Sequence, residues 1–287
     1  MAAVLFGLAA GALFGALSVS VQLGLRRGGD PEFGGFVTAA TGFVVAATGA
    51  LVEWGEVRPR ELWPFFVVGF VVPGASQVLF TKAVRYAGPA RSSILLGTAP
   101  LFAVVIALLV LDEPWKTELL AGTVLVVTGG AVLVRERMRP EHFRAIGAAL
   151  ALTCAALFAT RDNVVRWAAR AEHPPPLLAS ATSLLAAAAG VLLYLVIFRR
   201  AEVTAKLPAA LRAFVPAGFV LGIAYSCLLE AFDRGKVTVV APLNATQAFW
   251  AVLLSAVLFR RTESIGPRIV AAAVLVVAGS AVIGAFR

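Results

Sequence analysis

Polar side chains at helical spacing stand near the C-terminal end of an otherwise apolar chain. Asn244 and Gln247 are three residues apart, and Trp250 follows three residues after Gln247 and four after Thr246, so a helix would place them on one stripe. Pro242 would free a backbone carbonyl in the same helix and can kink it. Amides, a hydroxyl and an indole N–H can hydrogen-bond a small polar solute, which makes this stripe the leading candidate for solute contact. The alternative is polar bonding between helices, with an interfacial tryptophan.

A charged pair, Arg161 and Asp162, interrupts another apolar segment. Ionisable groups inside a hydrophobic helix are costly and therefore indicate a function. Adjacent residues of a helix point about 100° apart, which predicts a poor direct ion pair. Two alternatives stay open: the helix continues to Trp167 and buries both groups two turns inside its end, or it stops near Thr160 and leaves them in solvent.

Single polar residues in other apolar segments are weaker candidates. They are Gln77, Ser93, Thr98, Tyr225 and Ser226. Hydroxyls in such helices often bond the carbonyl four residues earlier, so a purely structural role is the alternative for each. The sequence contains no nucleophile–base pair, metal-ligand set or phosphate-binding loop, so we predict neither an enzyme nor a cofactor or metal site.

The composition indicates where these residues lie. The chain has 287 residues, 60% of them hydrophobic and 14% charged, with a mean hydropathy of +0.90. A soluble domain has about 25% charged residues, so this chain lacks the polar side chains to cover a soluble globule. The net charge of +9 comes from Lys and Arg around the apolar segments, where they meet lipid phosphates. We therefore predict a bilayer partner and no nucleic-acid binding.

Ten apolar segments fill the chain, and each is near the roughly 20 residues that a membrane-spanning helix needs. They cover residues 3–25, 33–53, 62–84, 92–111, 118–135, 145–167, 176–198, 210–232, 237–259 and 266–286. We predict an all-α integral membrane protein with ten transmembrane helices and both termini on one side of the bilayer.

The two halves of the chain repeat each other. The segments "AGTVLVVTGGAVLV" (121–134) and "AAAVLVVAGSAVIG" (271–284) are identical at eight of fourteen positions, where biased composition gives roughly three. Glu113 aligns with Glu263 at the same shift of 150. The repeats are predicted to be residues 1–137 and 138–287. Because five helices are an odd number, the second copy must insert upside down, which is the inverted-topology design of many secondary transporters, with a solute site between the repeats.

The first helix of each repeat carries a small residue at every fourth position. These residues are Gly7, Gly11 and Gly15 in one repeat and Ala151, Ala155 and Ala159 in the other. Such spacing predicts a flat stripe that lets a neighbouring helix approach closely.

The repeat also bears on pairing and orientation. Lys82 aligns with Glu230, but inversion places the two in opposite leaflets, so we predict gate or interfacial roles rather than a pair. Connectors after the odd-numbered segments hold sixteen Lys and Arg, and the other side holds nine. That bias favours termini outside the cytoplasm.

The segment "AVRYAGPARSSILLGTAPLFAVVIALLVLDEP" (83–114), followed by 121–134, resembles the EamA type of the drug/metabolite transporter superfamily. The shared pattern is an Ala-rich helix end, a small turn, a helix with a central proline at Pro100, and then Leu-x-Glu. The second half is a degraded copy, because Pro242 does not align with Pro100 and "FRRTE" replaces Leu-x-Glu. The resemblance covers the whole chain.

This resemblance implies ten helices, a central cavity lined by helices 1, 3, 4, 6, 8 and 9, and efflux or exchange of small organic metabolites, amino acids among them. It also implies cytoplasmic termini, against the Lys and Arg count, and we follow the resemblance here. We expect a secondary transporter in the plasma or inner membrane, monomeric or homodimeric, with Asp162 or Glu230 as a possible proton carrier. The rival hypotheses are a flippase for lipid-linked headgroups on the same fold and a non-transporting membrane scaffold.

Overall fold

The computed structural model describes residues 1–53, 59–102, 117–134, 144–172, 174–235, 237–259 and 266–286, and these residues form helices joined by short turns. The first half contains α1 (Ala2–Arg26), α2 (Pro31–Ala50), η1 (Leu51–Glu53), α3 (Pro59–Gly69), η2 (Phe70–Ala75), α4 (Ser76–Ala87), α5 (Pro89–Leu96) and α7 (Thr117–Val134). The second half contains α8 (Ala145–Glu172), α9 (Pro176–Phe198), α10 (Arg200–Arg234), α11 (Val237–Ala245), α12 (Gln247–Leu258) and α13 (Pro267–Phe286). Glu113 and Glu263 lie outside the described residues.

Seven helical segments in the described part of the chain are long and apolar enough to cross a bilayer. They are Ala2–Arg26, Pro31–Ala50, Arg60–Ala87, Ala145–Val165, Pro176–Phe198, Arg200–Arg234 and Val240–Leu258, and a shorter apolar helix covers Pro267–Ile283. Large apolar side chains such as Leu193, Ile197 and Phe198 point outward, as lipid-facing residues do. The chain is therefore a multi-pass membrane protein. The predicted segment 92–111 extends beyond the described residues, so the number ten stays a prediction.

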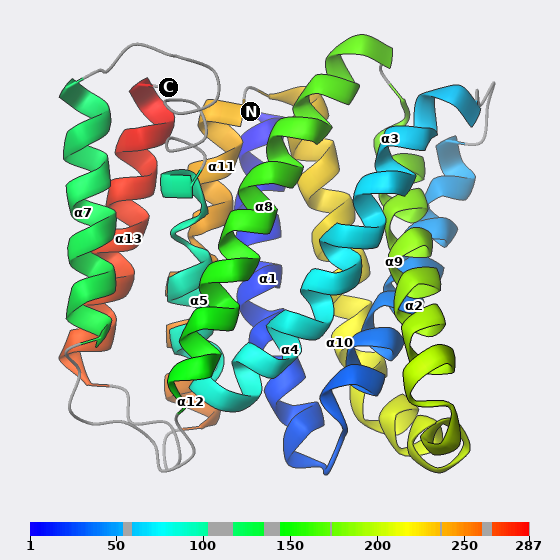
Figure 1. Cartoon of the computed structure of the whole chain (residues 1–287). Coiled ribbons are helices and arrows are strands. Elements are labelled where there is room, and N and C mark those ends of the chain that lie inside the picture. Colours follow the sequence, from blue (N-terminus) through cyan, green and yellow to red (C-terminus); the bar gives the residue numbers. More distant parts are fainter. Residues whose placement is uncertain are drawn as a thin grey trace.

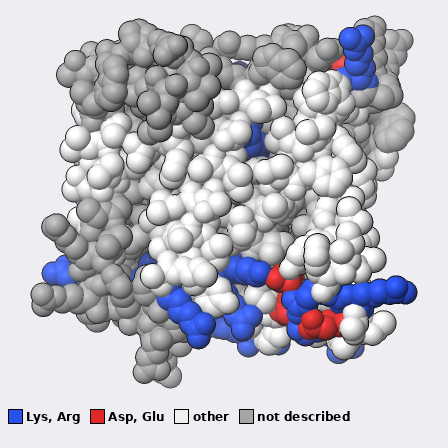
Figure 2. Space-filling model, in the orientation of Figure 1, with Lys and Arg blue, Asp and Glu red and all other residues white. Residues whose placement is uncertain are grey.

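The helices form a bundle with both termini at the same end, and α1 runs through its middle (Figure 1). The α7–α13 pair stands at one side of the bundle (Figure 1). Figure 2 shows that Lys and Arg gather at the end opposite the termini, while the flank of the bundle is mostly uncharged. This distribution is the one expected for a bundle whose sides face lipid and whose ends face water.

The two halves interlock instead of packing as separate bodies. In the first half, α1 packs on α10, α11 and α12; in the second, the corresponding α8 packs on α3, α4 and α5. Likewise α2 packs on α9 and α10, while α9 also packs on α3 and η2. Each of these contacts that a helix of the first half makes with the second half thus has an equivalent contact between the corresponding helix of the second half and the first half.

The small-residue stripe of α1 produces the close approach that its spacing predicts. A Cβ atom on Gly11 would lie 2.7 Å from the carbonyl oxygen of Leu243, and one on Gly15 would lie 2.6 Å from the Cβ of Trp250. The backbones of α1, α11 and α12 are therefore in contact. The equivalent alanines of α8 are fully buried or nearly so: Ala151, Ala155 and Ala159.

Three long helices are interrupted inside the bundle. Between α3 and α4, Val72 is extended (φ −137°, ψ 112°) before Pro73, as expected because a residue that precedes proline is disfavoured in the α conformation. In the first half, α5 ends at Leu96 and Gly97 and Thr98 form a turn; in the second, α11 ends at Ala245 and α12 begins at Gln247. Interrupted helices free backbone groups and re-aim side chains, and they occur at membrane depth only where protein or a cavity surrounds them.

Candidate substrate-binding site

A narrow central cavity lies where both halves meet. Its lining comes from α1, the η2–α4 segment, α5, α8, α10 and α12. They correspond to the predicted segments 1, 3, 4, 6, 8 and 9, the set that the family resemblance implies for a central cavity. The polar side chains that line it are Gln77, Arg161, Tyr225 and Gln247, together with Ser76. Four of the predicted site residues, from four different helices, therefore share one cavity.

Arg161 is held deep in the bundle. The helix α8 continues to Glu172, so the alternative that it stops near Thr160 is wrong. The Arg161 side chain is 4% exposed and the Asp162 side chain 19%. The Arg161 guanidinium donates from Nε (2.9 Å) and Nη2 (2.7 Å) to Oδ1 of Asp162.

The prediction that adjacent Arg161 and Asp162 make a poor direct pair is also wrong. The Cα–Cβ bonds diverge around the helix, but the arginine side chain is long enough to fold back onto the neighbouring carboxylate. The guanidinium also lies against two aromatic rings, with its carbon 5.0 Å from the Phe158 centroid and 5.6 Å from the Tyr225 centroid. Aromatic faces and one carboxylate thus compensate a charge inside a membrane-spanning helix.

Two further lining groups are polar atoms without a protein partner. The Gln77 Nε2 atom and the Tyr225 hydroxyl are buried, and neither has a hydrogen-bond partner among the described residues. Gln77 is 4% exposed and Tyr225 1%. An unsatisfied buried donor costs about 1–3 kcal/mol, so such groups need an explanation. A solute that enters the cavity would supply the missing acceptors.

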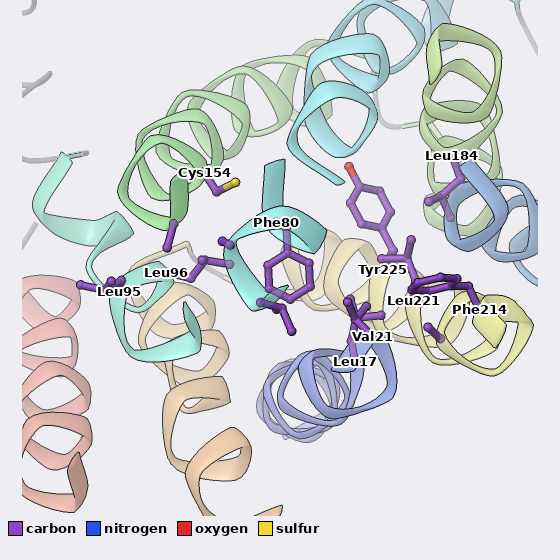
Figure 3. Packing of buried hydrophobic residues seen from close by; sticks show 14 of the residues in the cluster. Leu17, Val21, Phe80, Leu95, Leu96, Cys154, Leu184, Phe214, Leu221 and Tyr225 are labelled. Carbon is purple, nitrogen blue, oxygen red and sulfur yellow. The ribbon is translucent and has the colours of Figure 1, made fainter. Parts of the chain in front are cut away.

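Aromatic rings form much of the remaining cavity wall, and the sequence did not predict which ones. Phe14, Phe80 and Phe158 line it. Figure 3 shows Phe80 between Leu17 and Val21 of α1 on one side and Cys154 of α8 on the other, with Tyr225 beside it. No sequence motif marks these phenylalanines, because they match the apolar lipid-facing residues in type. Only their position relative to other helices distinguishes them.

The cavity is contracted in this conformation. The volume that the centre of a water-sized sphere can reach inside it is about 20 Å³, which is room for about one water molecule. A metabolite of several heavy atoms therefore enters only after the surrounding helices separate.

A much larger vestibule of about 790 Å³ opens at the end opposite the termini. Its lining includes Gln22, Arg26, Asp30, Arg85 and Lys206. Along α1 the vestibule reaches Gln22 and the cavity begins at Leu17, a separation of about 7.5 Å along the helix axis. Fully buried Val21 lies between them. A layer one to two turns thick, which contains Ser18 and Ser20 as well as Val19 and Val21, thus separates the vestibule from the cavity along α1.

An ion-pair cluster that sequence reasoning missed joins the halves beside the vestibule. Arg199 binds Asp30 (3.2 Å) and Glu32, while Lys82 binds Glu32 and Lys206 binds Asp30 (3.0 Å). Burial raises the pKa of Asp30, but hydrogen bonds from Lys206 and from the Glu32 N–H, with the charges of Lys206 and Arg199, outweigh it and hold this pKa below its ordinary value. The cluster ties α2 and α4 to the start of α10.

Lys82 and Glu230 do not pair, as predicted. Lys82 binds Glu32, and Glu230 binds Arg234 of its own helix at 2.6 Å. Neither residue is among those that line the central cavity.

The predicted stripe of helix 9 does not form as a unit. Gln247 lines the cavity, but Asn244, Thr246 and Trp250 are not among its lining residues. At about 100° per residue, Asn244 and Trp250 lie about 120° apart around a helix, so one narrow cavity does not reach both. The Thr246 hydroxyl donates to the Leu243 carbonyl at 2.6 Å. Thr246 and Trp250 instead lie against the glycines of α1. Asn244 is half-buried, and its Oδ1 has no partner among the described residues.

The remaining hydroxyl candidates hydrogen-bond within the protein. Ser93 shares a 2.6 Å hydrogen bond with Ser18 of α1, and Thr98 donates to the Leu95 carbonyl at 2.6 Å. Ser226 faces Ser180 of α9 at 3.3 Å. None of the three lines the cavity, so their observed contacts match the alternative of hydrogen bonding within and between helices. In the described part of the chain, no group of three or more His, Cys, Asp or Glu could hold a metal ion.

Comparison with known proteins gives a family and a fold. A model of the EamA-like transporter family matches residues 1–135 and 145–285. A solved structure described as "Crystal structure of protein" is similar over 98% of this chain and 95% of its own, with a TM-score of 0.66 and 23% identity. At that identity the likeness concerns the fold alone. No curated protein matches the chain.

Proposed function

The chain belongs to the EamA-like transporter family, and we propose that it is a secondary transporter that binds a small organic solute in the central cavity. The observation that carries this proposal is the convergence of Gln77, Arg161, Tyr225 and Gln247 from both halves on one buried cavity. Unpartnered donors in that cavity favour a ligand over a purely structural polar network.

Alternating access is the proposed mechanism. The repeats, residues 1–137 and 138–287, are proposed to be related by inversion within a ten-helix topology. Contacts that exchange between halves support this relation, since α1 meets α10 to α12 as α8 meets α3 to α5. Two such packings of similar energy let the cavity open toward either side in turn.

The solute is proposed to be an amino acid or a similar amphipathic metabolite. Arg161, the Gln77 amide and the Tyr225 hydroxyl would bind its polar part, and Phe14, Phe80 and Phe158 its apolar part. The cavity therefore combines fixed hydrogen-bond donors with an apolar wall, as sites for such ligands do. We propose export or exchange across the plasma or inner membrane, with Asp162 as the group that couples transport to protons.

Counterflow in proteoliposomes tests the proposal. Vesicles are preloaded with a pool of unlabelled amino acids and small metabolites, and uptake of each labelled compound is followed for the wild type, Gln247→Ala and Ser226→Ala. We expect uptake by the wild type, a loss of about tenfold or more in Gln247→Ala, and little change in Ser226→Ala, which lies outside the cavity.

A wild type that carries no compound in the pool would contradict the transport proposal. Translocation of fluorescent lipids would then test for a flippase, and its absence would favour a scaffold. Equal activity of Gln247→Ala and Ser226→Ala would instead place the site elsewhere in the bundle.

A further inference from the structure

We infer that the transported solute carries a carboxylate, and that this carboxylate takes the place of Asp162 on the Arg161 guanidinium. The inference rests on the proposed function and specifies its substrate class. Asp162 is then an internal stand-in for the substrate: it neutralises Arg161 in the contracted cavity and yields when the cavity widens.

The geometry of the pair supports replacement. Both hydrogen bonds from Arg161 end on one oxygen, Oδ1, so the two carboxylate oxygens do not meet the two edges of the guanidinium in parallel. A free carboxylate can adopt that bidentate arrangement, which is the stronger one. The stand-in is therefore a less favourable partner than an unconstrained ligand with the same chemistry.

The difference in burial between Arg161 and Asp162 also supports replacement of Asp162 by a ligand carboxylate. Arg161 is fixed in the cavity wall between Phe158 and Tyr225, at 4% exposure, whereas Asp162 is 19% exposed. The cation therefore stays in place while the carboxylate has room to turn away.

The charge of the cavity selects for an anion. Among the described residues that line it, Arg161 is the one charged side chain, and no acidic residue is part of the lining. The unpartnered Gln77 Nε2 atom and the Tyr225 hydroxyl add donors on neighbouring helices. Donors around a buried cation match carboxylate oxygens.

The lining of the vestibule also carries an excess of positive charge. Arg26, Arg85 and Lys206 outnumber Asp30 among its charged lining residues. A concave surface with excess positive charge and apolar surroundings raises the local concentration of anions. Phe14, Phe80 and Phe158 would then contact a hydrocarbon part, so the inferred class is a small carboxylate with an apolar group.

Thermal unfolding of the purified full-length chain in detergent tests the inference without requiring transport. The probes are two matched pairs, L-leucine with L-leucinamide and sodium isovalerate with isovaleramide, each at the same concentration and ionic strength. A ligand that binds the folded state raises the unfolding temperature, and at equal concentration the tighter ligand raises it more. We expect both carboxylates, and neither amide, to raise this temperature in the wild type.

Two variants separate binding from folding. In Asp162→Asn the stand-in charge is gone, so the carboxylates should bind about tenfold tighter or more and give a larger shift than in the wild type. In the double variant Arg161→Gln/Asp162→Asn both charges are removed together, so no unpaired buried charge is left to destabilise the fold. The carboxylate shift should disappear there.

The outcomes decide between the inference and the proposed function. Equal shifts from carboxylates and amides, equal shifts in the wild type and the double variant, or no shift from any probe would each overturn carboxylate recognition by Arg161. Counterflow of amides but not of carboxylates would overturn it while leaving the transport proposal intact. Carboxylate shifts without counterflow of any solute would retain the site and contradict transport.

Discussion

Thr98 and Thr246 make the same hydrogen bond at the same place in the two halves of the chain. Each hydroxyl donates to the carbonyl three residues earlier, Leu95 and Leu243 respectively, at 2.6 Å. Each threonine stands where a helix is interrupted, and α5 and α12 pack on each other. Leu96 and Gln247, the residues beside these interruptions, both line the central cavity.

Each of these carbonyls also accepts the backbone N–H of the same threonine, at 3.1 Å for Leu95 and 3.2 Å for Leu243, so the hydroxyl adds a second hydrogen bond that is expected to stabilise the turn. Thr98→Val and Thr246→Val should each lower the free energy of unfolding by about 0.5–1.5 kcal/mol, and Thr→Ser should retain most of it. Denaturant unfolding in detergent measures the difference. If Val and Ser variants unfold alike at both positions, these bonds do not support the interruptions.

Close contact between α1 and α12 predicts that Gly15→Ala is strongly destabilising. Its Cβ would lie 2.6 Å from the Cβ of Trp250 and 2.9 Å from the Ala251 nitrogen, so backbone has to move. Overpacking of this kind costs about 1–3 kcal/mol.

Gly49→Ala is the matched control for Gly15→Ala. It also lies in a helix, but the nearest atom would be 3.8 Å away, at Leu177 Cδ1, so this variant should be neutral or slightly stabilising. Thermal unfolding of both proteins in detergent gives the comparison. Similar unfolding temperatures for the two variants would argue against close packing at Gly15.

The ion-pair cluster predicts an acid-sensitive contact between the halves. Asp30 has a folded-state pKa below its ordinary value of 3.8, so its contribution to stability is present above that value and is lost as pH falls through the folded pKa. The wild type should therefore lose more stability than Asp30→Asn between neutral pH and about pH 3.

The measurement for the cluster is the unfolding temperature across this pH range, with Glu202→Gln as a second variant of the same cluster. Glu202 is half-exposed at the margin of the cluster and contacts Arg199 and Lys206. Parallel pH profiles for the wild type and Asp30→Asn would show that Asp30 has no such role.

The positions of the basic residues predict the orientation in the membrane. Arg26, Lys82, Arg85, Arg199 and Lys206 lie at the end opposite the termini. The positive-inside rule places that end in the cytoplasm and both termini outside, whereas the family resemblance implies cytoplasmic termini. We follow the family resemblance and expect a C-terminal alkaline phosphatase fusion to be inactive, and an active fusion would support the Lys and Arg distribution instead. An inactive phosphatase with a fluorescent C-terminal green fluorescent protein fusion would support the orientation of the family.

Local pattern alone predicted much of this protein. Helix positions follow from apolar segments of about 20 residues, because a bilayer demands that length whatever the helices pack against. The stripe of Gly7, Gly11 and Gly15 predicted close packing, because a spacing of four residues puts small side chains on one face of a helix whatever the partner is. The family and the set of cavity-lining helices were also accessible from the sequence through the resemblance.

Tertiary structure decided which side chains meet. Gln247 lines the cavity while Asn244 and Trp250 do not, because six residues of a helix turn Asn244 and Trp250 about 120° apart and the packing of neighbouring helices selects which part of the stripe meets the cavity. Arg161 and Asp162 pair because α8 continues beyond them and the bundle buries the Arg161 side chain. Phe80 and Phe158 differ from lipid-facing phenylalanines only in what lies opposite them. Periodicity is a property of one helix, whereas a cavity belongs to several, so its lining is fixed only when the helices pack.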